Sequence, residues 1–534
     1  MNKKEKQAKE ALQYHQYPVP GKTKVVPTKR YASQHDLGLA YSPGVAAPCL
    51  EIDKGNQNVY NYTNKGNLVG VISNGTAVLG LGNIGPEASK PVMEGKALLF
   101  KIFADIDVFD IEIDEEDPDK FIETVKNIAP TFGGINLEDI KAPEAFEIET
   151  RLKEELDIPI MHDDQHGTAI ISSAALINAL EIAEKKIEDV KIVVSGAGSA
   201  AIACTKLYVA LGAKVENILM FNSKGLLRKG QENLSDRQQE FASDKDFDSL
   251  EEAMVGSDVF LGLSVANLVS PKMLKSMNKN PIVFAMANPE PEIDYDLAVK
   301  TRKDVIMATG RSDFPNQVNN VLGFPFIFRG ALDVQAKKIN EEMKMAAVYA
   351  LADLAKKPVP EQVNIAYSET KLQFGREYII PKPFDPRLIA EVPPAVAKAA
   401  IKSDVASKTI TDWEGYKNSL LERMGSEDKI TRLMMNRAKS NLKTIVYAEA
   451  DQIDVLKAAQ HVYEDKIAIP ILLGRKEVIL ELMEELDFDP EGIKIIDPKA
   501  DEYIPLLRKY AKSLWTKRQR KGITLNKKKK LMRE

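Results

Sequence analysis

The sequence predicts an α/β protein with a doubly wound parallel sheet at its centre. Between residues 166 and 400, short apolar runs alternate with segments of helical periodicity, a pattern typical of parallel strands joined by helices. One of these runs ends in a glycine-rich turn that opens a helix. Because 534 residues exceed one hydrophobic core, we expect about three domains, on a prior of roughly 100–200 residues each.

The composition is that of an ordinary soluble globular protein, with 44% apolar residues, 28% charged residues and a net charge of −5. No apolar run approaches the roughly 18 residues of a membrane span, and no charged excess favours nucleic acid. Cys49 and Cys204 are far apart and lack metal-ligand spacing. We therefore predict a cytoplasmic protein without membrane or nucleic-acid partners, disulfides or zinc.

The pattern divides the chain into four segments. We expect an N-terminal α/β domain at 1–165, a Rossmann-type domain at 166–400, a helical linker at 401–428 and an incomplete α/β domain at 429–534. The predicted strands are 68–73, 107–113 and 155–160 in the first domain; 191–195, 216–221, 257–264, 281–289 and 304–310 in the second; and 441–450, 467–474 and 492–497 in the last. Helices are predicted at 167–183, 199–213, 411–429 and 452–465, and the basic end, 514–534, is typical of a solvated surface.

Two acidic pairs follow predicted strands of the first domain. Glu138 and Asp139 end one short apolar segment, and Asp163 and Asp164 lie between the strand 155–160 and the following helix. Ligands bind at the carboxyl edge of such sheets, so the two pairs could converge on one cation. Either pair alone is more often a solvated turn.

Glycine motifs occur twice. Gly80, Gly82 and Gly85 have the spacing GxGxxG, and Gly196, Gly198 and Ala201 form a variant of it. Dinucleotide binding needs an uninterrupted helix whose N-terminal N–H groups meet the pyrophosphate. Because Pro86 and Pro91 shorten the start of the helix after the first motif, we assign the dinucleotide to the second and expect the first to be a turn near substrate.

The choice of dinucleotide depends on the strand after the second motif. An acid commonly ends that strand and holds the ribose hydroxyls, but Asn222 occupies this place, with Ser223 and Lys224 beside it. A neutral amide and a cation favour a 2′-phosphate. The sequence therefore favours NADP, with NAD as the alternative.

Several ordered motifs together resemble the malic enzymes: LAYSPGVAAPC, MEGKALLF, GGINLEDIKAPE, HDDQHGTA, VVSGAGSAA, MANPEPEI and GRSDFPNQVNNVLGFPF. The chain is most similar to the bacterial NADP-dependent type, in which a phosphotransacetylase-like region follows the core. The resemblance implies oxidative decarboxylation of L-malate to pyruvate and CO2, a Mg²⁺ or Mn²⁺ ion, and at least a dimer. Residues 429–534 resemble only the front of the second region, so we expect it to be truncated.

The resemblance also implies roles for individual residues. Glu138, Asp139 and Asp164 match the metal ligands, Lys96 the general base, and Tyr41 the acid that protonates the enol carbon. Asp163 is expected to orient Lys96, whose pKa burial beside a dication would lower. The expected cofactor contacts are Gly196, Ala197, Gly198, Ser199, Ala200, Asn222, Lys224, Asn288 and Asn320; the expected substrate contacts are Asn74, Thr76, Asn288, Asn319 and Asn320.

One position departs from the family pattern. Longer malic enzymes carry an arginine that grips a malate carboxylate, and this chain has Ala77 there. Backbone N–H groups around Asn74 to Thr76, or another cation, must replace it. His162 and His166 flank the acids and are expected to be structural. The alternatives are an NAD-preferring malic enzyme or a non-catalytic sensor of acyl-CoA or acetyl phosphate.

Overall fold

The computed structural model describes residues 3–78, 81–367, 372–424, 434, 437–439, 441–464, 466–486, 488–489 and 491–518. Two compact units divide the chain, Met1–Met424 and Gly425–Glu534. Gly80 of the first glycine motif, the end of the predicted linker and residues 519–534 of the basic end lie outside the described residues.

The first sheet of the larger unit has four parallel strands in the order β2-β1-β3-β4. Its strands are β1 (Leu68–Ser73), β2 (Asp107–Glu112), β3 (Gly134–Leu137) and β4 (Ile160–His162). All six residues of β1 are buried, because β2 and β3 flank it and helices cover the sheet. The helices up to this point are α1 (Lys3–Gln16), α2 (Gln34–Ala40), α3 (Ala46–Asp53), α4 (Val59–Tyr62), α5 (Pro86–Ala104), α6 (Pro118–Ile128), α7 (Glu144–Glu155) and α8 (Asp163–Ala183).

The second sheet has the order β10-β9-β8-β5-β6-β7. Its strands are β5 (Ile192–Ser195), β6 (Ile218–Asn222), β7 (Gly225–Leu226), β8 (Val259–Gly262), β9 (Ile282–Ala285) and β10 (Ile306–Thr309). The predicted doubly wound parallel sheet is confirmed, except that β7 pairs antiparallel with β6 as a hairpin at one edge. The helices are α9 (Ser199–Ala210), α10 (Asp236–Gln239), α11 (Leu250–Met254), α12 (Pro271–Ser276), α13 (Tyr295–Thr301), α14 (Phe324–Asp333), α15 (Glu341–Lys356), α16 (Glu361–Ala366), α17 (Leu388–Lys402) and α18 (Trp413–Arg423).

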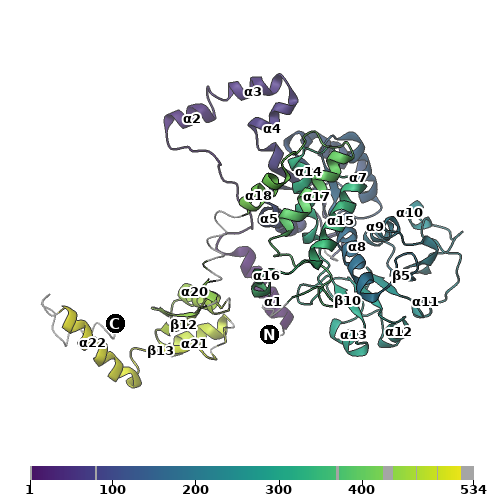
Figure 1. Cartoon of the computed structure of the whole chain (residues 1–534). Helices are drawn as coiled ribbons and strands as arrows, with labels where there is room; N and C mark the ends of the chain where they lie inside the picture. The colour runs from purple at the N-terminus through teal and green to yellow at the C-terminus, as the bar shows by residue number, and fades with distance from the viewer. Residues whose placement is uncertain are drawn as a thin grey trace. The chain divides into compact units, whose positions relative to one another are not determined.

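Helix α8 joins the two sheets. It begins directly after β4, packs against α9 and α15, and passes through the predicted boundary between residues 165 and 166 (Figure 1). Fifteen of its residues are buried. Among the described helices, α8 is the one long and apolar enough to span a membrane, although the sequence analysis expected no such segment. However, 72% of its most apolar stretch of 18 residues is buried inside the unit. It is a core helix.

The smaller unit contains a three-stranded parallel sheet in the order β11-β12-β13. Its elements are β11 (Lys443–Tyr447), α20 (Ile453–Glu464), β12 (Ala468–Leu473), α21 (Lys476–Glu485), β13 (Lys494–Ile496) and α22 (Ile504–Arg518). A separate apolar core that includes Leu456, Leu472 and Ile479 holds it together. The alternation predicted from the sequence is therefore present here too.

Candidate active site

Strand register brings the two acidic pairs together. β3 and β4 are parallel neighbours, and Leu137 pairs with His162 at the last position of each strand. The next residues along the chain are Glu138 and Asp139 on one side, and Asp163 and Asp164 on the other. Both pairs therefore leave the same carboxyl edge of the sheet, as the sequence predicted.

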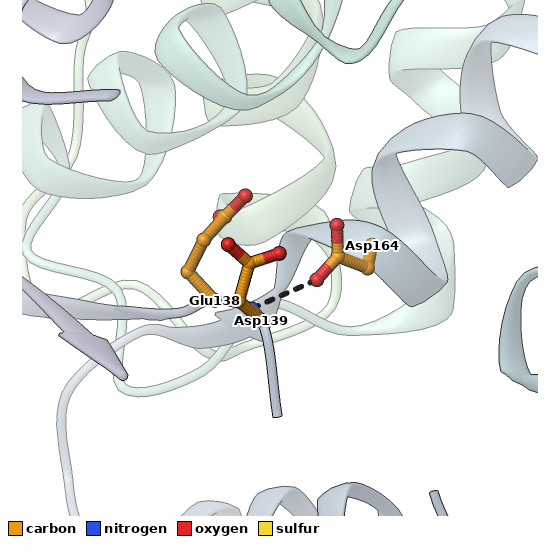
Figure 2. Close-up of side chains that lie close together, drawn as sticks. All are labelled: Glu138, Asp139 and Asp164. Carbon is orange, nitrogen blue, oxygen red and sulfur yellow. Dashed lines mark hydrogen bonds between the residues drawn. The ribbon is translucent and has the colours of Figure 1, made fainter. Parts of the chain in front are cut away.

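Three of these carboxylates converge. Glu138, Asp139 and Asp164 each offer an oxygen, and the three oxygens lie within 4.8 Å of one another (Figure 2). The backbone N–H of Asp139 donates to Asp164 Oδ2 at 3.0 Å, the dashed line in Figure 2. Glu138 and Asp139 are buried, whereas the Asp164 side chain is 39% exposed. The cluster is thus open on one side.

Lys96, on α5, reaches this cluster from the neighbouring layer. Its Nζ lies 2.6 Å from Asp163 Oδ2 and 2.8 Å from Glu138 Oε1. Burial opposes the ammonium charge, but the negative charges of Asp163, Glu138 and Asp164 outweigh it and hold the pKa of Lys96 above its usual range. The neighbouring carboxylates of the chain therefore raise the pKa of Lys96, whereas the sequence analysis expected a bound dication to lower it.

The residues present fit a divalent cation. Burial raises the pKa of Glu138 well above its usual range, and although Lys96 lowers it, the charges of Asp164, Asp163 and Asp139 raise it further. Like charges this close repel one another, so a cation between them would relieve the repulsion. Hard carboxylate oxygens are the ligands that Mg²⁺ and Mn²⁺ prefer.

Asp163 contacts Lys96 and is not one of the three converging acids. Its Oδ2 also accepts a hydrogen bond from Asn320 Nδ2 at 3.0 Å, and Asn320 Oδ1 accepts one from Thr168 at 2.8 Å. A Cβ at Gly167 would lie 2.2 Å from Asp163 Oδ1 and 3.1 Å from Asn320 Cβ. Glycine at 167 therefore makes room for this contact.

The two histidines that flank the acids, His162 and His166, differ in their hydrogen bonds. His166 is hydrogen-bonded to Glu149 at 3.0 Å and to Lys344 at 3.1 Å, and burial lowers its pKa to about 4. Within the described residues, neither ring nitrogen of the buried His162 has a hydrogen-bond partner. The contacts of His166 agree with the structural role that the sequence suggested.

The turn that contains Asn74 and Thr76 packs against the acids. Thr76 Oγ1 donates to Asn74 Oδ1 at 2.7 Å, and Asn74 Nδ2 donates to the Glu115 carbonyl at 3.2 Å. The Ala77 N–H donates to the Asp139 carbonyl at 3.0 Å. Both predicted substrate residues thus lie beside the acidic cluster, although the Ala77 N–H is already used within the chain.

The second glycine motif forms the turn from β5 into α9. Gly196 has a φ of +115°, and a Cβ there would lie 2.5 Å from the Leu263 carbonyl oxygen, so glycine is needed. Gly198 is the N-cap residue and Ser199 opens the helix, followed by Ala200. Asn222 Oδ1 accepts from the Lys224 N–H at 2.8 Å in the β6–β7 hairpin. The motif is placed as predicted, but the hairpin was not predicted.

Gly82 and Gly85, the described glycines of the first motif, lie in the loop before α5, but the predicted shortening of that helix by its prolines was wrong. Helix α5 begins at Pro86 and continues through Pro91 to Ala104, so neither proline shortens it. Proline suits the first helical positions because their N–H groups have no partner in the helix. Gly85 has a φ of +84°, and its carbonyl oxygen would lie 2.1 Å from a Cβ at Gly75.

For three predicted residues, the described part of the chain shows no hydrogen bond or ion pair with the acids. Asn288 is exposed just after β9. The Asn319 side chain accepts from the Val321 N–H at 3.0 Å, so it caps a short turn. Tyr41 is 78% exposed at the end of α2, and in the described part of the chain no hydrogen bond or ion pair joins its side chain to Lys96 or the acids.

The sequence prediction missed two residues that contact the site. Asn136 Nδ2 donates to Glu138 Oε2 at 2.8 Å, and Lys96 Nζ lies 4.5 Å from the centre of the Phe324 ring. Asn136 precedes Glu138 by two positions, and this alternation in a strand places two side chains on one face. That spacing could have identified Asn136. Nothing local to Phe324 indicates its contact with Lys96.

Comparison with known proteins agrees with this arrangement. Residues 20–118 and 115–153 match the family model "Malic enzyme, N-terminal domain", residues 165–371 match "Malic enzyme, NAD binding domain", and residues 429–534 match "Phosphate acetyl/butaryl transferase". The fold and site are those of a nicotinamide-dinucleotide oxidoreductase.

Relatives and solved structures agree on the family. The NADP-dependent malic enzyme of Salmonella typhimurium is 53% identical over 96% of this chain and 68% of its own length. The NAD-dependent malic enzyme of Rhizobium meliloti is 51% identical over 93% of this chain and 66% of its own length. The crystal structure of a malic enzyme from Pyrococcus horikoshii, 40% identical, covers 80% of this chain and 98% of its own with a TM-score of 0.73. The chain belongs to the malic enzyme family.

Proposed function

We propose that this chain oxidatively decarboxylates L-malate to pyruvate and CO2 while reducing NADP⁺, with Mg²⁺ or Mn²⁺ as a required cofactor. The observation that carries the proposal is the contact of Lys96 with Asp163 beside three converging carboxylates at a sheet edge. The family and the NADP-dependent relative support the same reaction.

The residues near the acids have distinct tasks in this proposal. Glu138, Asp139 and Asp164 would hold the cation, which when bound polarises the C2 oxygen and stabilises negative charge that develops there. The pKa of Lys96, which the acids alone raise, would be lowered by a bound dication, so that a neutral Lys96 takes the proton of the C2 hydroxyl. Asp163 together with Asn320 holds Lys96 in place. Asn74, Thr76 and Asn319 are proposed to orient malate.

NADP is the proposed dinucleotide, with its pyrophosphate at the turn Gly196–Ala200. Asn222 ends β6 without a negative charge, and Lys224 follows in an exposed turn, where it can meet a 2′-phosphate. Asn288 and Asn320 are proposed to contact the nicotinamide end. Because relatives with either cofactor have similar identity to this chain, the preference rests on Asn222 and Lys224.

We also propose that the chain acts as at least a dimer in the cytoplasm. Residues 23–62, which we call the arm, contain no buried residue, and Figure 1 shows α2 and α3 standing away from the two sheets. The exposed apolar side chains of the arm include Leu39, Tyr41 and Leu50. Such a concentration is typical of a surface that another copy covers, and it could bring Tyr41 to a partner's site.

The decisive experiment is an assay of the purified protein with malate, Mn²⁺ and either NADP⁺ or NAD⁺, with and without EDTA. We expect NADPH and pyruvate in equal amounts, faster turnover with NADP⁺, and loss of activity in EDTA. Accumulation of oxaloacetate in place of pyruvate would reject the decarboxylation step.

A further inference from the structure

A buried carboxylate, Glu292, ties together two loops at the carboxyl edge of the second sheet. Its Oε1 accepts a hydrogen bond from the Ser264 N–H at 2.9 Å, and its Oε2 accepts one from the Ala287 N–H at 3.1 Å. Ser264 follows β8 and Ala287 follows β9, and Glu292 is fully buried. One side chain thus fixes the positions of both loops.

These loops adjoin the dinucleotide turn. Ser195 of β5 pairs with Gly262 of β8, which pairs with Ala285 of β9, so the three strands end at the same level. Ser195 Oγ is hydrogen-bonded to Ser264 Oγ at 2.8 Å. Gly196 and Asn288 each follow directly on residues of this network. Glu292 therefore connects the pyrophosphate turn with the loop that carries Asn288.

The space around Glu292 is tight. A Cβ at Gly262 would lie 2.4 Å from Glu292 Cδ and 2.6 Å from each of its carboxylate oxygens. Because Gly262 at the end of β8 has no side chain, the Glu292 carboxylate fits against it, and the close packing fixes the position of the carboxylate.

Burying the Glu292 carboxylate without a cation opposes folding, so stability by itself does not explain a glutamate here. Among the described residues, no lysine or arginine forms an ion pair with Glu292. Burial raises its pKa, although hydrogen bonds from the backbone of Ser264, Ala287 and Glu292 itself and from the Ser264 side chain lower it. A buried carboxylate without a cation loses hydration that hydrogen bonds from neutral groups recover only in part. Asp258, at the opposite end of β8, is instead paired with Lys185 at 2.8 Å.

We propose that Glu292 is a positioning residue for the dinucleotide, because it holds the Ser264 and Asn288 loops at the edge where the nicotinamide half binds. This inference rests on the proposed function. It assigns to Glu292 a role in cofactor binding that metal binding does not share, since Glu138, Asp139 and Asp164 follow strands of the other sheet.

The test is Glu292→Gln. Glutamine keeps the shape of the side chain but has one acceptor oxygen in place of two for the N–H groups of Ser264 and Ala287. We expect KM and the directly measured Kd for NADP⁺ to rise about ten-fold or more, as for loss of a charged hydrogen bond. The affinity for Mn²⁺ should change less than about two-fold, because the acidic cluster is untouched. KM for malate should rise less than the NADP⁺ constants, because Asn288 is only one of five expected malate contacts. The matched control is Asp258→Asn, which removes a carboxylate from the other end of β8 and should leave the NADP⁺ constants unchanged.

Three results would overturn the inference: unchanged NADP⁺ binding in Glu292→Gln, an equal rise in the constants for malate and Mn²⁺, or the same NADP⁺ effect in Asp258→Asn. If Glu292→Gln does not fold, Glu292→Asp keeps the anion and is judged by the same NADP⁺-selective rise. A wild-type protein that binds NADP⁺ but does not turn over malate would reject the proposed function, while the Kd comparison would still decide the role of Glu292.

Discussion

At the scale of single residues, the site depends on one lysine among four carboxylates. Lys96 contacts Asp163 and Glu138 and lies over the Phe324 ring, so it is held from three directions. From the sequence, Lys96 alone resembles any surface lysine on a helix, and only the family motif singled it out. The structure places it where the proposed proton transfer needs a base.

We predict that Lys96→Ala lowers kcat by roughly 10²–10⁴-fold, the usual contribution of a general base. Mn²⁺ should still bind, because the three converging carboxylates remain. Titration of Mn²⁺ by calorimetry, together with steady-state kinetics, checks both parts. Lys90→Ala is the control, because Lys90 lies on the same helix but pairs with Asp110 and Glu112 at the surface. Retained turnover in Lys96→Ala would show that another group is the base.

Cofactor preference also belongs to the residue scale. We predict that Asn222→Asp moves the ratio of kcat/KM for NADP⁺ and NAD⁺ toward NAD⁺ by roughly ten-fold, because a carboxylate repels the 2′-phosphate and can bind ribose hydroxyls. Kinetics with both dinucleotides measure this ratio. Asn217→Asp, just before β6, is the control, and an unchanged ratio in Asn222→Asp would place 2′-phosphate recognition elsewhere.

At the scale of elements, apolar periodicity predicted most strands because they are short and parallel. The predicted strand 155–160 was wrong, because Glu155 ends α7 and only Ile160 lies in β4. The runs at 68–73 and 191–195 became β1 and β5, and the glycine turn before α9 followed from its spacing. The prediction of elements from sequence failed at two further places, the start of α5 and the end of β6. α5 tolerates Pro91 within its first two turns, and the β6–β7 hairpin interrupts the strand–helix alternation with a two-residue turn.

Helix α8 gives a prediction at this scale, because its second turn must pass close to Asp163 and Asn320. Gly167→Ala should lower kcat/KM by about ten-fold or more, since the added Cβ displaces Asp163 from Lys96. Gly95→Ala is the matched control: its Cβ would meet only Lys22 Nζ, at 3.5 Å, and alanine favours a helix by roughly 0.5–1 kcal/mol. Kinetics and thermal melting compare the two. Equal activity in both variants would show that α8 has room to adjust.

At the scale of the whole molecule, the arm is the feature that the larger unit does not explain. The Lys22 N–H donates to Glu94 on α5 at 3.0 Å. Beyond the arm, Lys65 and Asn67 contact the sheet region again, through the Pro130 and Asp105 carbonyls. A single copy therefore holds Lys96 and the acids together but keeps Tyr41 in solvent. A symmetric dimer in which each arm reaches the other copy would complete both sites.

We predict that Tyr41→Phe and Lys96→Ala are each nearly inactive, but that a mixture refolded or exchanged together recovers activity. If Tyr41 serves the partner's site, half of the dimers are mixed and each has one intact site, so recovery approaches about a quarter of the wild-type rate. Sedimentation equilibrium should show at least a dimer. No recovery in a mixture proven to contain mixed dimers would mean that Tyr41 acts within its own chain.

The sequence by itself determined most of the strands, the doubly wound class, the glycine turn before α9 and the two acidic pairs at strand ends, because these depend on local periodicity and on residues next to strand ends. Only the tertiary structure decided which of them meet. The pairing of Leu137 with His162 brought the acids together, the packing of α5 brought Lys96 to Asp163, and the fold left Tyr41 outside. The physical reason is that contacts between distant segments depend on strand register and helix packing, which no local pattern of residues specifies.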